Sequence, residues 1–234
     1  MIGDTDTSEL RPICNRSIAS HDGCVKRLCD CMLAGIGLVV LSPVLVIIGA
    51  VLFGLGFNKP LFVQKRVGQN GRTFVIFKFR TLRDRTCRPL SPRVRRYAET
   101  FASLLRHSGL DELPQFINVL RGEMSLVGPR PHSLADHHSF ARHIPDYAGR
   151  LVIKPGMTGW AQVQGWRGPV CTPDQLRGRL NCDLDYIARH SLALDVVILI
   201  RTAALPLKML LRPARYRKNC LGPQPCLRCH RRMV

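Results

Sequence analysis

The sequence is short of acidic residues. Among 234 residues, 16 are Asp or Glu against 35 Lys or Arg, which gives a formal net charge of +19. No acidic residue follows Asp195. Such an excess of positive charge predicts an anionic partner. The partner could be nucleic acid, an acidic membrane surface or a phosphorylated small molecule. Because 46% of the residues are apolar, a wholly disordered chain is excluded and a domain with a core is expected.

The first twenty residues lack the pattern of a removable secretory signal. A signal places an apolar run after a basic start, whereas Asp4, Asp6 and Glu9 make this segment polar. The ten cysteines are irregularly spaced, so we expect reduced thiols in a cytosolic compartment. Cys226–His230 formally matches a haem-attachment pattern and, with Cys220, offers zinc ligands; a reduced basic tail is the alternative that we favour.

Charged residues are also absent from Met32 to Phe57. This run is long enough to cross a hydrocarbon core of about 30 Å as a helix. Basic residues flank it on both sides, Lys26 and Arg27 before it and Lys59 after it, so neither end is predicted to lie outside the cell. The central pair Ser42 and Pro43 predicts a kink. A kinked spanning helix and a re-entrant helix that returns to the same face both remain open.

A hairpin, a basic loop and several helices are predicted after the apolar run. Residues 61–82 contain two Val-, Ile- and Phe-rich runs around Gly-Gln-Asn-Gly, which predicts a β-hairpin. Its basic residues either face lipid head groups or a phosphorylated ligand, or are simply solvated. A basic loop at 85–96 precedes helices predicted at about 97–105, 173–190 and 191–211. Polar interruptions in the last helix favour a position on a membrane surface.

Two of the scarce acids are adjacent in "GLDELPQFINVL", residues 109–120. Apolar residues at helical spacing predict a short amphipathic helix from about Asp111 to Arg121, and Pro114 fits only its first turn. Asp111 and Glu112 then lie at the helix N-terminus, where free N–H groups and the helix dipole favour negative charge. The pair is therefore either a helix cap or part of a site.

Several stretches together resemble the bacterial sugar transferases, also called monotopic phosphoglycosyl transferases. The resemblance covers about Cys24 to Leu205, in family order, and its segments are "KRLCD", the apolar run with "LSP", "FVQKRVGQNGRTFVIFKFRTL", "GLDELPQFINVLRGEMSLVGPRP", "VIKPGMTGWAQVQGWRG" and "CDLDYIARHSLALDVVIL". It implies an enzyme that moves a sugar 1-phosphate from a UDP-sugar to undecaprenyl phosphate, with Mg²⁺, and releases UMP. The product initiates exopolysaccharide or another cell-surface glycan. The segments "VQGWRG" and "CDLDYI" are more similar to transferases that use glucose or galactose than to those that use acetamido sugars.

The resemblance also implies residue roles. Asp111 would attack the phosphate that bears the sugar, and Glu112 would handle a proton or support the metal, which makes both of them tentative Mg²⁺ ligands. The other family positions fall into two groups. The positions that would bind substrate are Arg106, Gln115, Glu123, Pro129, Arg130, Pro131 and Arg167. The positions of the re-entrant helix are Lys26, Arg27, Ser42 and Pro43. Of these, Lys26 and Arg27 would touch lipid head groups, and the helix would break at Ser42 and Pro43. Two positions depart from the family: Ser91 replaces an acid and His107 replaces an arginine.

The predicted fold class is α+β and mostly helical, with a re-entrant membrane helix, a β-hairpin and membrane-surface helices around a compact cytosolic core. We expect a polar segment at 1–23, the membrane helix with its basic flank at 24–58, the catalytic domain at 59–211 and a basic Cys-containing tail at 212–234. The expected location is the bacterial inner membrane, with the catalytic domain on the cytoplasmic face. Phospholipids are expected partners, nucleic acid is not, and a homo-oligomer is left open.

Two other functions compete. A membrane-anchored basic protein could bind anionic lipid or nucleic acid without catalysis. Stacking on nucleic acid favours aromatic residues among the basic ones, and the two basic segments at 85–96 and 212–234 contain only Tyr216. A nucleotide-sugar pyrophosphatase would instead release sugar phosphate to water, and an assay without the lipid acceptor distinguishes it.

Overall fold

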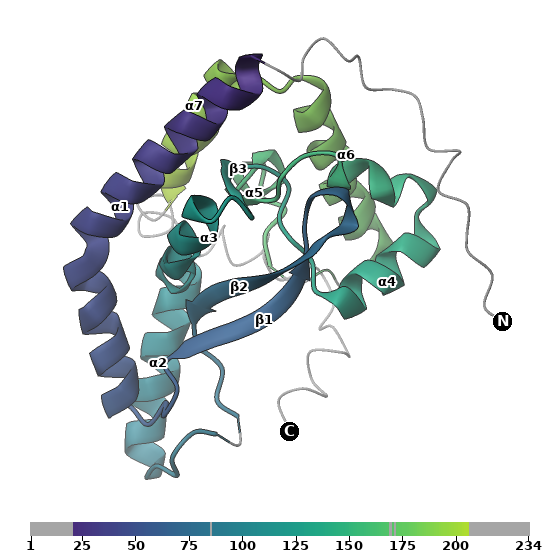
Figure 1. The fold of residues 1–234 in the computed structure, drawn as a ribbon. Helices are drawn as coiled ribbons and strands as arrows, with labels where there is room; N and C mark the ends of the chain where they lie inside the picture. Colours follow the sequence, from purple (N-terminus) through teal and green to yellow (C-terminus); the bar gives the residue numbers. More distant parts are fainter. Residues whose placement is uncertain (1–20, 85, 169, 171, 206–234) are drawn as a thin grey trace, which may run out of the picture.

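The computed structural model describes residues 21–205 except 85, 169 and 171. The described chain is mostly helical, with one antiparallel and one parallel two-stranded sheet, which confirms the mostly helical α+β prediction. The long helix α1 (His21–Gly54) runs along one side of the molecule, and the remaining elements gather beside it (Figure 1). The predicted polar segment up to residue 20, the basic tail and the end of the helix predicted at 191–211 lie outside the described residues.

Helix α1 continues through Ser42 and Pro43 and bends near its middle (Figure 1). The expected break at this pair is therefore a bend inside one helix. Proline removes one backbone donor, and the Ser42 hydroxyl donates to the Val39 carbonyl at 2.8 Å, which satisfies one acceptor in the same turn. Within the described residues, Gly23–Gly54 is one helix long and apolar enough to cross a membrane. Re-entry stays a prediction.

Polar contacts hold the first part of α1 to the rest of the protein. Lys26 Nζ lies 2.5 Å from Asp195 Oδ2, and Arg27 donates to the carbonyls of Val119 and Leu120 at 2.6 and 2.9 Å. Asp30 Oδ1 accepts from the Leu126 amide at 3.1 Å. The basic pair predicted to touch lipid head groups thus makes protein contacts.

The predicted hairpin is present. Strands β1 (Leu61–Val67) and β2 (Thr73–Phe79) pair antiparallel over seven residues each. Asn70 lies in the turn with φ of 53°, a left-handed conformation that asparagine tolerates better than most residues. The pairing places Arg66 opposite Phe74 and Lys78 opposite Phe62, so both cations share one face of the hairpin.

The other elements follow the hairpin in chain order. They are α2 (Pro92–Ser108), the 3-10 helix η3 (Leu110–Gln115), α3 (Phe116–Leu120), β3 (Ser125–Val127), α4 (Leu134–His143), the 3-10 helix η4 (Pro145–Leu151), β4 (Gly156–Thr158), α5 (Trp160–Val163), α6 (Pro173–Ala188) and α7 (Leu192–Ala203). Strands β3 and β4 pair in parallel.

The structure departs from two predicted helix boundaries. Helix α2 begins at Pro92, earlier than the predicted residue 97, because Pro92 occupies the first helical position. The helix predicted at 111–121 is a 3-10 helix followed by one short α-helix. Pro114 explains the change, since it supplies no N–H for the α-helical ladder.

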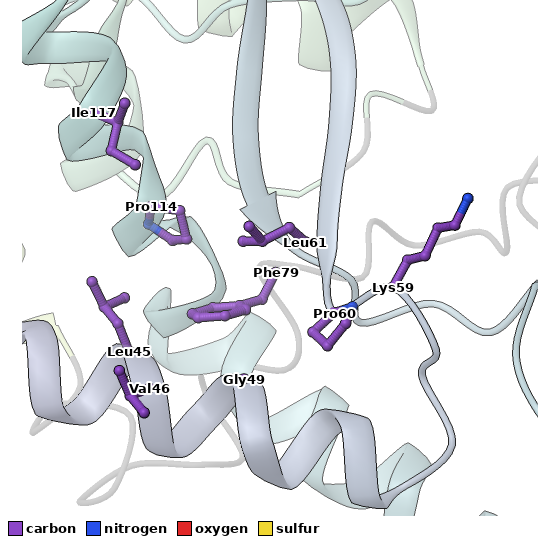
Figure 2. A pocket seen from close by; sticks show the side chains of 9 residues that line it. All are labelled: Leu45, Val46, Gly49, Lys59, Pro60, Leu61, Phe79, Pro114 and Ile117. Atoms are coloured by element: carbon purple, nitrogen blue, oxygen red, sulfur yellow. The ribbon is translucent and has the colours of Figure 1, made fainter.

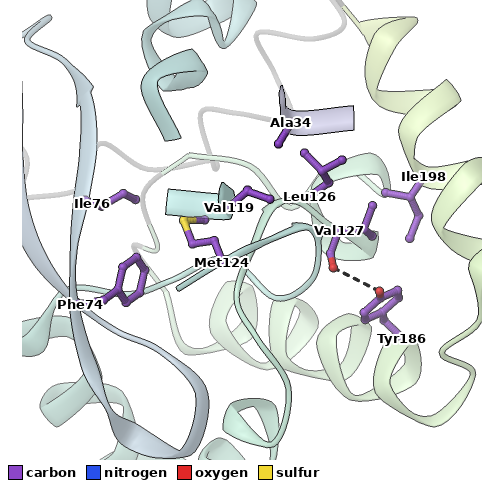
Figure 3. Close-up of a cluster of buried hydrophobic side chains, with 9 residues drawn as sticks. All are labelled: Ala34, Phe74, Ile76, Val119, Met124, Leu126, Val127, Tyr186 and Ile198. Carbon is purple, nitrogen blue, oxygen red and sulfur yellow. Dashed lines mark hydrogen bonds between the residues drawn. The ribbon is translucent and has the colours of Figure 1, made fainter. Parts of the chain in front are cut away.

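Two of the three apolar clusters in the described residues join α1 to the rest of the protein. The larger joins α1, β2, the α3–β3 segment, α6 and α7, with Met124 and Val127 at its centre, and the Tyr186 hydroxyl donates to the Val127 carbonyl at 3.3 Å (Figure 3). The second packs the last turns of α1 against Phe79 of β2 and one face of α2. Both halves of α1 therefore rest on the same domain.

Candidate active site

The acidic pair lies in the first turn of the 3-10 helix η3. Helix α2 is capped by Gly109, whose φ of 78° turns the chain, and Asp111 lies in the first turn of η3. Gly109 therefore occupies the cap position, so of the two alternatives for the pair the one in which Asp111 is the N-cap is wrong. Asp111 is only 6% exposed, and its carboxylate has no hydrogen bond within the described residues. Burial and the neighbouring Glu112 raise the pKa of Asp111 to about 6, against the opposing charges of Lys78, Arg130 and Arg106.

Glu112 is bound by an arginine fork. Arg130 Nη1 donates to Glu112 Oε2 at 2.9 Å, and Nη2 donates to Oε1. Burial alone would raise the pKa of Glu112, but the charge and hydrogen bonds of Arg130, together with Lys78, hold it below its ordinary value. At neutral pH, Glu112 is thus an ionised, occupied partner of Arg130, and Asp111 is the acid without such a partner.

The hairpin adds two cations, Arg66 and Lys78, for which the sequence left lipid head groups, a phosphorylated ligand and solvent open as partners. Burial and the charge of Arg66 lower the pKa of Lys78, whereas Glu112 and Asp111 raise it. Burial likewise lowers the pKa of Arg66, as does the charge of Arg130. A sequence signal existed, because strand alternation puts both residues on one face, but their distance from the acidic pair depends on tertiary packing.

The other predicted substrate residues divide between the site and its support. Arg106 donates to the Thr81 carbonyl, and its charge lowers the pKa of Asp111. The charge of Arg167 contributes to the lowered pKa of Glu112, so this residue also lies near the pair. Gln115 is buried within η3, and Pro129 and Pro131 flank Arg130.

Glu123 has a supporting position. Its Oε2 accepts from Asn118 Nδ2 at 2.7 Å, and this fully buried asparagine also bonds the backbone of β2 at Val75 and Phe77. Glu123 therefore anchors the hairpin to α3, and within the described residues no contact joins it to the acidic pair.

A second buried charge network supports Arg130. Arg150 Nε and Nη2 lie 3.0 and 2.7 Å from Asp183 Oδ2, and Arg150 Nη2 also donates to the Arg130 carbonyl at 2.7 Å. Arg150 Nη1 lies 2.9 Å from His132 Nδ1, which requires a neutral imidazole that accepts at this nitrogen. Burial, with Arg150 next in effect, lowers the pKa of His132, in agreement with that state. None of these three residues was predicted.

An apolar groove of about 500 Å³ lies between α1, the hairpin and the η3–α3 segment (Figure 2). Leu45, Val46 and Gly49 of α1 form one wall. The opposite wall belongs to Leu61 and Phe79 of the hairpin and to Pro114 and Ile117 of η3 and α3, whereas the Lys59 ammonium points outward (Figure 2). Pro114 is three residues after Asp111 in η3, so the groove connects the apolar surface of α1 to the element that carries the acidic pair.

The acidic pair offers few ligands for a metal ion. No group of three or more His, Cys, Asp or Glu side chains in the described part of the chain could hold a metal. Both Glu112 oxygens already accept from Arg130, whereas Asp111 is without a hydrogen-bond donor. Mg²⁺ commonly binds one or two carboxylates together with waters and substrate phosphates, so these residues fit a metal that arrives with a phosphorylated substrate.

Comparison of the sequence with known protein families identifies the family. The sequence model of the bacterial sugar transferase family matches residues 21–209. The chain belongs to the bacterial sugar transferase family. Its relatives include a UDP-glucose:undecaprenyl-phosphate glucose-1-phosphate transferase of Xanthomonas campestris pv. campestris, 42% identical over 76% of this chain and 38% of the relative.

Two further relatives show the range of the family. The exopolysaccharide production protein PSS of Rhizobium leguminosarum bv. phaseoli is 36% identical over 76% of this chain and 92% of the relative. A UDP-N-acetylgalactosamine-undecaprenyl-phosphate N-acetylgalactosaminephosphotransferase of Aeromonas hydrophila is 38% identical over 76% of this chain and 42% of the relative. The chain thus spans about two fifths of the length of several relatives.

Proposed function

We propose that this sugar transferase moves a hexose 1-phosphate, glucose or galactose 1-phosphate, from a UDP-sugar to undecaprenyl phosphate and so initiates exopolysaccharide or another cell-surface glycan. The products are undecaprenyl-diphosphate-sugar and UMP. The names of the relatives support this donor and acceptor class. The observation that carries the proposal is the buried Asp111, an acid without a hydrogen-bond partner in the described chain, surrounded by Lys78, Arg106 and Arg130.

The site suits a two-step transfer. An Asp111 oxygen attacks the phosphorus that bears the sugar, and the bond from that phosphorus to the UMP oxygen breaks. UMP leaves and a phosphosugar remains on Asp111. A phosphate oxygen of the lipid then attacks the same phosphorus, which releases the carboxylate and forms the lipid diphosphate sugar. A nucleophile with a pKa near 6 is mostly ionised at neutral pH, and its neighbouring cations offset repulsion from the diphosphate.

Magnesium is the proposed cofactor. When bound, it would neutralise charge on the diphosphate, and Asp111 is the side chain best able to contact it. Glu112 is a weaker ligand candidate because Arg130 occupies both of its oxygens. In this arrangement Glu112 and Arg130 hold each other beside the reacting phosphate, and Lys78 and Arg66 add positive charge from the hairpin.

The apolar groove suits the isoprenoid chain of the acceptor. Its walls are apolar, α1 lines one side and Pro114 of η3 lines the other, so a lipid tail there would carry its phosphate toward η3 and Asp111. The contacts of α1 favour re-entry. A helix of 34 residues is about 50 Å long, yet its first turns and its last turns both pack on the same domain. With re-entry, the domain would lie on the cytoplasmic face of the inner membrane and contact phospholipids.

Release of UMP tests the proposal. Detergent-solubilised protein is incubated with a panel of UDP-sugars, Mg²⁺ and undecaprenyl phosphate, and Asp111→Asn serves as the inactive variant. We expect lipid-dependent UMP release with one donor, lost in the variant. Release that survives Asp111→Asn would contradict the covalent mechanism. Salt-sensitive binding of nucleic acid or anionic lipid without turnover would favour the non-catalytic alternative instead.

A further inference from the structure

The loop that carries Arg130 is held at four consecutive carbonyls. Each carbonyl from residue 129 to residue 132 accepts a hydrogen bond from a different part of the protein. The pairs are Pro129 with the Gly156 amide at 3.0 Å, Arg130 with Arg150 Nη2 at 2.7 Å, Pro131 with Arg66 Nη1 at 3.4 Å and His132 with the Val67 amide at 3.1 Å. The backbone that presents the Arg130 guanidinium to Glu112 is therefore fixed from several sides.

The contact at Arg130 differs from the others because its donor belongs to a buried ion pair. The side chains of Arg150 and Asp183 are each 3% exposed. Asp183 from α6 accepts from two nitrogens of Arg150, which orients the guanidinium. The same guanidinium reaches the Arg130 carbonyl and His132. The ion pair thus connects α6 and η4 to the loop beside the acidic pair.

A buried ion pair contributes little net stability, because the cost of removing both charges from water offsets most of their attraction. Its directional hydrogen bonds still fix a geometry that apolar packing would not. We propose that Arg150 and Asp183 are positioning residues for phosphosugar transfer: they hold the Arg130 backbone so that its guanidinium pairs with Glu112 beside Asp111. The inference rests on the proposed function, but its structural part can be measured without turnover.

The decisive variant replaces the whole pair by apolar residues of similar size, Arg150→Met with Asp183→Leu. Such replacements of buried ion pairs often leave stability unchanged. In full-length detergent-solubilised protein with ¹⁵N-labelled arginine, the Arg130 side-chain N–H signals are assigned by their loss in Arg130→Lys. Pairing with Glu112 slows solvent exchange of these protons in the wild type. We expect faster exchange in the double variant, whether or not the protein transfers sugar phosphate.

The kinetic arm uses Arg150→Lys, which keeps the charge but loses the fork. We expect kcat/KM for UMP release to fall by about 10- to 100-fold, the usual effect of removing a supporting contact around a reactive group. In the background of Arg130→Lys, the same substitution should have little further effect, because both act through one guanidinium. Arg177→Lys, an exposed arginine on α6, is the matched control and should leave the rate unchanged.

Each result has a defined meaning. Faster Arg130 exchange together with non-additive kinetics supports positioning. Two results would overturn the proposal and show a merely structural role. One is an unchanged Arg130 exchange rate in a folded double variant. The other is that the losses of kcat/KM caused by Arg150→Lys and Arg130→Lys multiply fully, together with a lowered melting temperature. If the wild type releases no UMP with any donor, the proposed function fails, and the exchange measurement still decides whether the ion pair positions Arg130.

Discussion

Replacing Asp111 by Asn should abolish transfer and at the same time stabilise the protein. Asp111 is buried, and its pKa is raised from 3.8 to about 6. Between pH 3.8 and about 6, Asp111 is therefore more protonated in the folded than in the unfolded state. The free energy of unfolding falls as pH rises through this range. Above about pH 6 the full cost of burying the charge is present. A shift of roughly 2 units corresponds to about 3 kcal/mol at most, which Asn does not incur.

Thermal unfolding at several pH values measures this effect. For a domain of this size, 1 kcal/mol shifts the melting temperature by about 2–4 °C, so Asp111→Asn should gain up to about 10 °C at pH 7.5. The gain should shrink as pH falls below 6 and vanish near pH 4, where Asp111 is protonated in both states. The samples contain a chelator and no donor, and Asp146→Asn, at an exposed acid, is the control. A variant with no gain at pH 7.5, or a gain independent of pH, would refute the assignment of Asp111 as a destabilised buried charge.

Three further results are expected. The rate of the first half-reaction, UMP release, should fall below about pH 6 in step with protonation of Asp111, and a flat profile down to pH 5 would contradict its role as nucleophile. Gly49→Leu should fill the apolar groove, since a Cβ atom at this position has one neighbour within 4 Å, the Cε1 atom of Phe79 at 3.8 Å. It should raise KM for undecaprenyl phosphate but not for UDP-sugar, whereas Gly54→Leu on the same helix should change neither. Arg27→Ala should lower the melting temperature, because it removes the hydrogen bonds that Arg27 donates to the Val119 and Leu120 carbonyls at the end of α3. The expected loss in the free energy of unfolding is about 1–3 kcal/mol. An unchanged melting temperature would show that those carbonyls find other donors.

Local sequence signals predicted the elements well. The apolar run of α1, the Asn-Gly turn of the hairpin and the start of α6 at Pro173 each follow from residues close together in the chain. The short parallel pair of β3 and β4 escaped prediction because its strands have three residues each and lie some thirty residues apart. Helix α4 was also missed, since its polar, His-rich sequence shows little apolar periodicity.

The site was predicted only as far as family resemblance reached. Resemblance brought together Asp111, Glu112 and Arg130, and the structure shows that Arg130 binds Glu112. The support beneath them was not predictable. An arginine in η4 and an aspartate in α6 carry no sequence mark of a buried ion pair, because their partnership exists only after both elements pack against the loop.

The most direct test of the account is intact-protein mass spectrometry after incubation with a UDP-sugar and Mg²⁺ in the absence of lipid acceptor. The account predicts a mass increase of one hexose phosphate, mapped to Asp111 by peptide analysis, absent from Asp111→Asn and lost from the wild type when undecaprenyl phosphate is added. Lipid-dependent UMP release without any such adduct under rapid quenching, or an adduct on another residue, would contradict transfer through Asp111.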